Sequence, residues 1–358
     1  MTSPEPEAWD QFVEANDPGS YLQLSGWAAV KAVNGWSAHR LTAGGGTPGG
    51  AGQEAIGAQI LVRRPRPMPW GFAYAPRGPV AAGWNAGTIQ AFTQGARQAL
   101  PGLAERISHL RIDPEIELEG PLDPDGELRR ALRAAGWRPA SPIQPNATRI
   151  VDLRADEDGL WGDLRKKWRQ YINKARNAGI VVVEAREERL PEFYRIYRET
   201  ADRAGFLIRA EAAYRDVWNA FARDGRARLL FAQAPDGEAI ATLFLVRSGQ
   251  RVVEPYGGMT AAGGESRANY LLKWEAIRSS REAGATTYDL WGLATGGIAN
   301  FKTGFGGREV RYIGAWDLVL DPVGRRAYDL AQRGRVWWAR RRHGIAGGAN
   351  AAAYGPAD

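Results

Sequence analysis

The chain contains no cysteine and only three histidines among its 358 residues. Without cysteine it can form neither disulfides nor thiolate metal sites, and it has no cysteine nucleophile. His39, His109 and His343 stand far apart in the sequence, so a histidine-based zinc site is not expected. No window offers the roughly 18 consecutive apolar residues of a membrane span, and the start, MTSPEPEAWDQF, has no signal region. We therefore expect a cytoplasmic protein that holds no metal.

Acidic residues are in the minority, with 40 Asp and Glu against 47 Lys and Arg, and the net charge is +7. The basic excess is local, in one cluster at residues 165–176 and another at residues 325–342. Such clusters attract phosphates, nucleic acid or anionic lipid headgroups. The alternative interpretation of each cluster is a solvated basic surface.

One order of apolar and turn-forming segments occurs twice along the chain. In the first half a strand, a hairpin strand, a helix and a strand are predicted at residues 55–64, 71–80, 88–100 and 109–114. In the second half the same order is predicted at residues 239–248, 251–259, 268–283 and 286–291. A duplication spaced by about 180 residues predicts an α/β (α+β) fold with two similar domains in tandem, not a short-period solenoid.

The boundary between the domains is predicted near Val151, where the extended run TRIVDL gives way to Asp156 and a new helix. The first domain is predicted at residues 1–150, and the chain is expected to rejoin it at about residues 320–345. The second domain is predicted at residues 151–319, and a flexible tail at residues 346–358. Residues 43–52, AGGGTPGGAG, predict a flexible surface loop.

Residues 292–314, GLATGGIANFKTGFGGREVRYIG, follow a predicted buried strand and place Phe301 and Lys302 among glycines. The strands of an α/β sheet end at its ligand cleft, and glycine lets the backbone approach a ligand closely. Lys302 is therefore predicted to be a functional cation on a short flexible loop, beside a ring that can stack. The alternative is a glycine-rich hairpin with a solvated lysine.

A helix is predicted from Gly159 to Ala178, because apolar residues recur on one arc at about 100° per residue and Gly179 follows as a stop. The arc expected to face the core contains Leu160, Trp161, Leu164, Trp168, Tyr171, Ile172 and Ala175. The basic residues along or just beyond its edge are Arg165, Lys166, Arg169 and Arg176. This edge is predicted to bind a polyanion.

Six segments stand out in chain order: YLQLSGWAAVKAVNGW (21–36), YAPRGPV (74–80), RIDP (111–114), LRKKWRQYINKARNAGI (164–180), NYLLKWEAIRSSREAGATTYDLWG (269–292) and NFKTGFGG (300–307). Together they resemble segments of the Fem-type peptidoglycan-bridge aminoacyltransferase family. The resemblance covers about residues 21–320 and implies two GNAT-like domains in tandem.

The resemblance also implies a reaction. Such enzymes transfer an amino acid from aminoacyl-tRNA to the side-chain amine of residue three of a peptidoglycan stem peptide, on a lipid-linked or UDP-linked precursor. Because the tRNA ester is already an activated carbonyl, no ATP, metal, cofactor or covalent intermediate is needed. A monomer is expected, working in cell wall biogenesis and cell shape.

The acceptor amine must lose a proton, and an oxyanion develops on the carbonyl that it attacks. Asp113, at the end of the RIDP strand, is the candidate that accepts or orients the proton; the alternative is a cap of an Asp-Pro turn. Lys302 is the candidate that stabilises the developing charge. In the family the pair that matches Phe301 and Lys302 is implicated in handling the acyl-tRNA.

The resemblance assigns phosphate binding to Lys31 and Arg209, with Arg203 as a rival to Arg209. Tyr256 resembles a tyrosine that lines the peptide channel, and Tyr214 belongs to the segment that carries Arg209. Two residues before Tyr256 the family often has another aromatic residue, whereas this chain has Glu254.

Some relatives bind tRNA with the help of a long coiled-coil insertion, but no heptad pattern persists here over three or four repeats. Binding of tRNA would then rest on the set Arg165, Lys166, Arg169 and Arg176, or on the arginine-rich end.

Two alternatives remain open. The first is a GNAT-type N-acyltransferase that uses an acyl-CoA, although AAGGESRANYLL (261–272) lacks the usual glycine spacing of a pyrophosphate loop. The second is a non-catalytic protein that binds RNA or a membrane surface. It is favoured by the end of the chain, where Trp337 and Trp338 among arginines resemble a basic anchor for the inner face of the membrane.

Overall fold

The structure is a computed structural model that describes the backbone of residues 4–44, 55–65, 67–103, 106–293 and 297–343. Side chains are described for the same residues except 298, 332–333 and 335–343. Most of the predicted loop at 43–52, the predicted tail and the side chains of Trp337 and Trp338 lie outside the described part. Within the described part, no helix is both long and apolar enough to cross a membrane.

The chain divides into two compact units, residues 1–146 with the segment from 311 onward, and residues 147–310. The elements of the first unit are α1 (Pro6–Ala15), η1 (Tyr21–Gln23), α2 (Ser25–Ala32), β1 (Ser37–Ala43), β2 (Ile56–Arg63), β3 (Gly71–Ala75), β4 (Val80–Ala81), α3 (Ala86–Ala99), η2 (Leu100–Gly102), β5 (Ile107–Ile112), α4 (Glu127–Ala134), β6 (Trp137–Ala140), β14 (Ala315–Val319) and α12 (Pro322–His343). The chain returns to this unit at Arg311, before the predicted position of about 320, because β14 pairs with β5 and β6.

The second unit follows the order β7 (Ala147–Asp152), α5 (Glu157–Asp163), α6 (Lys166–Asn177), β8 (Val181–Ala185), η3 (Glu187–Arg189), α7 (Leu190–Ala204), α8 (Glu211–Phe221), β9 (Ala227–Gln233), β10 (Ala239–Ser248), β11 (Arg251–Met259), α9 (Ala261–Glu265), α10 (Ala268–Glu282), β12 (Thr287–Asp289), α11 (Gly297–Thr303) and β13 (Arg308–Arg311). Among the described residues each unit contains a seven-stranded sheet, with the orders β1-β2-β3-β5-β14-β6 (β4 pairs with β2) and β13-β7-β12-β11-β10-β9-β8.

The two sheets share one local topology. In the first, β2 and β3 form an antiparallel pair, and α3 leads to β5, which pairs parallel with β3. In the second, β10 and β11 form the antiparallel pair, and α10 leads to β12, which pairs parallel with β11. A helix between two parallel strands must cross a face of the sheet. The predicted α/β class is therefore confirmed.

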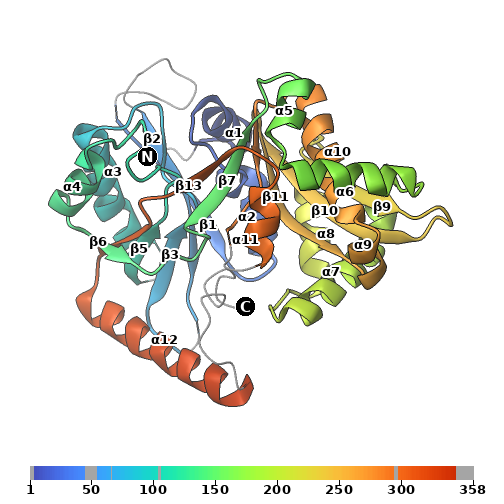
Figure 1. The fold of residues 1–358 in the computed structure, drawn as a ribbon. Helices are drawn as coiled ribbons and strands as arrows, with labels where there is room; N and C mark the ends of the chain where they lie inside the picture. The colour runs from blue at the N-terminus through green and yellow to red at the C-terminus, as the bar shows by residue number, and fades with distance from the viewer. Residues whose placement is uncertain (1–3, 45–54, 66, 104–105, 294–296, 344–358) are drawn as a thin grey trace. The chain divides into compact units, whose positions relative to one another are not determined.

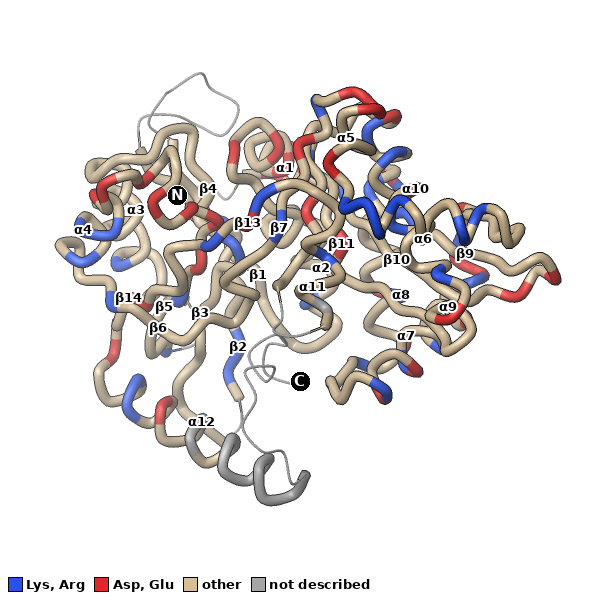
Figure 2. The backbone as a smooth tube through the Cα atoms, in the orientation of Figure 1, with Lys and Arg blue, Asp and Glu red and all other residues tan. Residues whose placement is uncertain are grey.

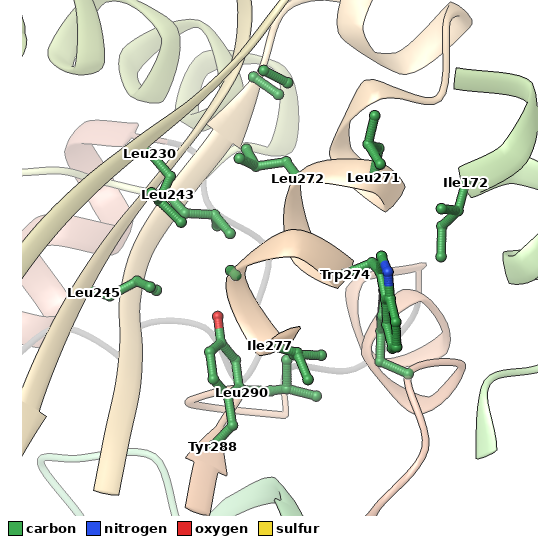
Figure 3. Packing of buried hydrophobic residues seen from close by; sticks show 14 of the residues in the cluster. Ile172, Leu230, Leu243, Leu245, Leu271, Leu272, Trp274, Ile277, Tyr288 and Leu290 are labelled. Atoms are coloured by element: carbon green, nitrogen blue, oxygen red, sulfur yellow. The ribbon is translucent and has the colours of Figure 1, made fainter. Parts of the chain in front are cut away.

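Alternation along β10 explains how helices cover both faces of the second sheet. Leu243 and Leu245 belong to the core under α10, together with Leu272 and Tyr288 (Figure 3). Phe244 points to the other face, where its ring contacts Phe193 of α7 and Trp218 of α8. Successive side chains of a strand point to opposite faces. Accordingly, α6 and α10 cover one face, and α7 and α8 cover the other (Figure 1).

The helix predicted from Gly159 to Ala178 is wrong as one continuous element. It is interrupted at Leu164 and Arg165, where the backbone is extended, so α5 ends before α6 begins. The break lets the Arg165 amide donate to the Gly304 carbonyl oxygen at 3.0 Å. The predicted core arc is only partly buried: Leu160, Leu164, Ile172 and Ala175 are buried, whereas Trp161, Trp168 and Tyr171 are half-buried.

The described beginning of α12 is tied to the first sheet. Arg325 forms ion pairs with Asp317 of β14 and Asp329, and Tyr328 stacks on Phe72 with 5.1 Å between ring centroids. Arg325 therefore has a packing role within the first unit. The predicted membrane anchor rests on the remaining arginines and on Trp337 and Trp338, and it stays a prediction.

We expect Gly307→Ala to destabilise the second unit by about 2 kcal/mol or more. Gly307 has φ +68°, and an added Cβ would lie 2.2 Å from the Ile150 carbonyl oxygen. Denaturant unfolding followed by circular dichroism measures the change. Gly162→Ala is the matched control, because nothing lies within 4 Å of its added Cβ. Equal unfolding midpoints for the two variants would contradict the prediction.

Candidate active site

Lys302 lies in the last turn of α11, so the prediction of a flexible loop is wrong at this residue. Its side chain is half-buried, and its ammonium donates to the carbonyl oxygens of Trp291 and Gly292, the latter at 2.8 Å. Both of these residues have left-handed backbones, with φ +47° and +63°. Asp289 stabilises this turn, because its Oδ1 accepts a hydrogen bond from the Trp291 amide at 2.8 Å. The turn after β12 (Thr287–Asp289) thus forms a carbonyl cradle for one cation.

The charge of Lys302 is sensitive to its surroundings. Burial and, to a smaller extent, the positive charge of Lys273 lower the pKa of Lys302 to about 8, although Glu254 and Asp289 oppose the shift. With a pKa near 8, Lys302 is still mostly protonated at pH 7. An incompletely solvated cation stabilises a developing negative charge more strongly than one in bulk water.

Phe301 precedes Lys302 and connects α11 to α6. Its ring forms edge contacts with Tyr270 at 5.0 Å and Phe305 at 5.1 Å, and its carbonyl oxygen accepts a hydrogen bond from Trp168 Nε1 at 3.0 Å. An added Cβ on Gly304 would lie 2.3 Å from the Trp168 ring, so this close approach requires glycine. Trp168 packs against the core, as sequence periodicity predicted, and it also contacts the segment that carries Phe301 and Gly304.

The four basic residues predicted to bind tRNA have different environments. Arg169 donates to the Trp161 and Gly162 carbonyl oxygens at 3.1 and 2.8 Å and so caps the end of α5. Arg176 forms an ion pair with Glu275 at 2.9 Å. Arg165 and Lys166 are exposed, and the Arg165 guanidinium lies 5.5 Å from the Trp168 ring centroid. Figure 2 shows the basic positions along α6.

Two further cations lie on this surface, Lys167 from the predicted basic cluster at residues 165–176 and Arg267, which the sequence interpretation missed. The Lys167 ammonium and the Arg267 guanidinium lie 5.6 and 4.6 Å from the centroid of the Tyr171 ring. Arg267 belongs to the turn before α10 and is remote from α6 in the sequence. Only its backbone, with φ +65°, and the fold bring it to Tyr171.

On the α7 and α8 face of the second sheet, the structure brings together three of the predicted binding residues. The hydroxyl of Tyr214 accepts a hydrogen bond from the Arg209 amide at 3.2 Å, and its ring meets that of Tyr256 edge-on at 5.0 Å. Tyr214 is buried, whereas Arg209 and Tyr256 are half-buried. The rival Arg203 donates to the Met259 carbonyl oxygen at 2.7 Å.

Asp113 in the first unit is buried and bonded on both carboxylate oxygens. Oδ2 accepts from the Tyr74 hydroxyl at 2.7 Å, and Oδ1 accepts from the Arg77 amide at 2.6 Å. Burial raises the pKa of Asp113, while the charge of Arg77 and these hydrogen bonds oppose the shift. Arg77 has φ +55°, and its side chain pairs with Glu115 at 3.2 Å. The carboxylate thus stabilises a left-handed turn, and a role as proton acceptor stays a prediction.

Lys31 lies at the end of α2 against two indoles. Its ammonium is 5.5 Å from the Trp27 ring centroid and 5.9 Å from that of Trp36. Arg63, which the sequence interpretation missed, lies 5.8 Å from the same Trp36 ring. Trp36 therefore has two cations beside it, one from α2 and one from the end of β2.

In the described part of the chain, no group of three or more His, Asp or Glu residues is placed to hold a metal ion. The groups around Lys302 are two backbone carbonyls, the aromatic rings of its segment and the ion pair of Lys273 with Glu254. Their chemistry is that of charge stabilisation and stacking, which suits acyl transfer from an activated ester.

A model of the FemAB family matches residues 5–236 and 228–333, which is most of the chain. The chain belongs to the FemAB family. The predicted family is therefore confirmed.

Among curated relatives, the lipid II:glycine glycyltransferase of Staphylococcus aureus (strain MRSA252) is 28% identical over 240 residues, 65% of this chain and 54% of the relative. The protein of the same name from strain NCTC 8325 / PS 47 is 27% identical over the same shares. The chain spans about half the length of these relatives.

Solved structures confirm the fold of this FemAB protein. FemX superposes with a TM-score of 0.80 at 21% identity and covers 92% of this chain and 98% of its own. L-PGS from Bacillus licheniformis gives a TM-score of 0.53 at 13% identity, covering 95% and 98%. A tandem GNAT protein from the clavulanic acid biosynthesis pathway gives 0.51 at 15% identity, covering 80% and 84%. The prediction of GNAT-like architecture is confirmed.

We expect Lys302 to react with acetic anhydride half-maximally near pH 8. Only the unprotonated amine reacts, so labelling rises with pH through the pKa, which burial has lowered to about 8. Isotope-coded labelling from pH 6 to 11, read by peptide mass spectrometry, measures the transition. Free lysine in the same tube is the internal standard, with a side-chain pKa of about 10.4. A Lys302 transition that coincides with this standard would contradict the prediction.

Proposed function

We propose that this FemAB protein transfers an amino acid from aminoacyl-tRNA to the side-chain amine of residue three of a peptidoglycan precursor. The observation that carries the proposal is a lysine held in a carbonyl cradle within a chain of this family. The curated relatives named lipid II:glycine glycyltransferase support peptidoglycan as the acceptor class. Support for the tRNA donor comes from the exposed cations of α6 beside the Phe301 and Lys302 segment.

In the proposed reaction the unprotonated acceptor nitrogen attacks the ester carbonyl carbon of the aminoacyl-tRNA. The C–N bond forms as the carbonyl electron pair moves to oxygen, and the tetrahedral intermediate then expels the ribose oxygen. The amine gives up one proton, and the leaving ribose oxygen takes one. Lys302 stabilises the negative charge that develops on these oxygens, an effect absent from the ground state. Asp113 is the proposed proton acceptor, which would require a change in its bonds to Tyr74 and Arg77.

The other predicted residues have binding roles in this proposal. Lys31 and Arg209 bind the diphosphate of a lipid-linked or UDP-linked precursor. Tyr214 and Tyr256 line the path of the stem peptide. The basic residues of α6 contact tRNA phosphates, chiefly Arg165 and Lys166, because these two are exposed. Arg169 and Arg176 contribute mainly by shaping α5 and α6, since their side chains already bind the Trp161 carbonyl and Glu275.

The acyl-CoA alternative has less support. In a GNAT enzyme that uses CoA, open backbone amides before a helix bind the pyrophosphate. Here the short helix α9 fills the segment before α10, and an added Cβ on Gly263 would lie 2.1 Å from the Ile240 carbonyl oxygen. This glycine is required by packing against β10.

The direct experiment uses purified protein and an acceptor carrying UDP-linked or lipid-linked pentapeptide with lysine at residue three. Glycyl-, alanyl- and seryl-tRNA, each radiolabelled, serve as donors in separate reactions, with acetyl-CoA as the competing donor. Transfer of label to the lysine side chain from one of the tRNAs supports the proposal. Acetyl transfer without transfer from any tRNA would refute it.

We expect Lys302→Ala to impair the transfer reaction and Lys31→Ala to impair binding of the acceptor. Loss of a charge-stabilising donor lowers the rate about 100-fold or more, so Lys302→Ala should lower single-turnover rate with little change in acceptor affinity. Lys31→Ala should instead weaken acceptor binding and leave the rate at saturation near that of the parent. Rapid-quench kinetics and acceptor titration measure both. Arg223→Ala, in the exposed turn after α8, is the control for loss of one cation. A collapse of acceptor affinity with normal turnover in Lys302→Ala would contradict the assignment.

A further inference from the structure

Glu254 of β11 is a buried acid that the proposed chemistry does not use. Glu254 as a residue is 7% exposed, and Lys273 of α10 and Tyr288 of β12 are 3% and 0% exposed. One oxygen of Glu254 forms an ion pair with the Lys273 ammonium, and the other accepts a hydrogen bond from the Tyr288 hydroxyl at 2.8 Å. Figure 3 shows Tyr288 within the cluster between the sheet and α10. The three residues come from three different elements of the second unit.

The side chains of Glu254 and Tyr256 lie on opposite faces of the sheet, although two residues normally separate side chains on the same face. The register between β10 and β11 shifts between Phe244 and Val246, and this irregularity reverses the alternation. Tyr256 therefore meets Tyr214 on the α8 side, whereas Glu254 meets Lys273 on the α10 side. The acid at position 254 consequently has no part in the cluster of Tyr214 and Tyr256.

Stability alone does not account for this buried pair. Two charges removed from water lose hydration, and their attraction often only offsets that loss, so apolar replacements are commonly neutral or stabilising. A buried pair that also fixes neighbouring groups has a second role. The neighbours of this pair are the α11 segment that carries Phe301 and Lys302, and strand β12, which leads into the carbonyl cradle.

Both ends of the pair lead to Lys302. The Lys273 ammonium lies 5.5 Å from the ring centroid of Phe301 and 5.8 Å from that of Phe305, on either side of Lys302 in the chain. At the other end, Tyr288 belongs to β12, the strand that leads directly into the carbonyl cradle at Trp291 and Gly292. Glu254 thus connects the helix that carries Lys302 with the strand that supplies its carbonyl partners.

We propose that Glu254, Lys273 and Tyr288 form a positioning clamp that holds α11 and the carbonyl cradle together and so fixes the place of the Lys302 ammonium. The catalytic consequence rests on the function proposed above for Lys302. The clamp itself is a statement about where the ammonium lies and how it is shielded. It can therefore be tested without an activity assay.

The charges around Lys302 give the clamp an electrostatic signature. Lys273 faces it from α10, Glu254 from β11 and Asp289 from β12, and Asp289 is itself paired with Arg251. Neutralising Glu254 leaves the charge of Lys273 uncompensated, so Glu254→Gln should lower the pKa of Lys302 below its value of about 8. Neutralising Lys273 alone should raise it. A structural pair without influence on Lys302 would produce neither shift.

The test compares Glu254→Gln, Lys273→Met and the double variant with the parent by acetic anhydride labelling of Lys302 across pH. We expect a lower transition in Glu254→Gln, a higher one in Lys273→Met, and a several-fold faster limiting reaction of Lys302 in the double variant, because α11 is less tightly held. Glu184→Gln is the matched control. It removes an acid paired with Arg228 between β8 and β9, and it should leave Lys302 labelling unchanged.

Turnover gives the second readout. The double variant contains no unpaired buried charge, so its thermal stability should be close to that of the parent, while its single-turnover rate should fall about ten- to hundredfold at unchanged acceptor KM. Parent-like labelling and turnover in a stable double variant would overturn the clamp. If the charge variants do not fold, Tyr288→Phe removes a single hydroxyl, and unaltered Lys302 labelling in that variant would overturn it as well.

The two proposals can fail separately. If Lys302→Ala retains the parent single-turnover rate, the catalytic role of Lys302 fails, and the labelling data still decide whether the clamp exists. If Lys302→Ala is inactive and the clamp variants label and turn over like the parent, only the clamp is refuted.

Discussion

The structure of the second unit depends on the need of one ammonium group for oxygen partners. A lysine withdrawn from water loses hydration that other oxygens must replace. For Lys302 these are the carbonyl oxygens of Trp291 and Gly292. Both residues have left-handed backbones and lie just beyond the end of β12. The two hydrogen bonds therefore tie α11, which carries Lys302, to the turn after β12.

The neighbouring buried charges compensate one another in pairs. Lys273 is paired with Glu254, and Arg251 is paired with Asp289, whereas the hydrogen bonds described for Lys302 go to two backbone carbonyl oxygens. Burial then lowers the pKa of Lys302 to about 8, which leaves it charged at neutral pH but poorly hydrated. A cation in this condition interacts strongly with charge that forms nearby.

Much of the fold could be predicted from sequence patterns. Alternating and helical periods located the repeated strand, hairpin strand, helix and strand, since these periods reflect which face of a local element is buried. The segment with Phe301 and Lys302 was also recognisable, because glycines crowd around it. The break at Leu164 and Arg165 was not predictable, since it depends on a hydrogen bond to Gly304, far along the chain. The hydrogen bond from Trp168 to the Phe301 carbonyl was not predictable for the same reason.

What the sequence alone determined is the family, the α/β class and the residues that can carry charge or stack. The tertiary structure decided which of these residues are available. Asp113 accepts hydrogen bonds from Tyr74 and Arg77, and Arg169 caps the end of α5. A shift in strand register places Glu254 and Tyr256 on opposite faces of the sheet. Local periodicity cannot contain this information, because each arrangement depends on partners that only folding brings into contact, and a one-residue shift in register reverses the face on which a side chain lies.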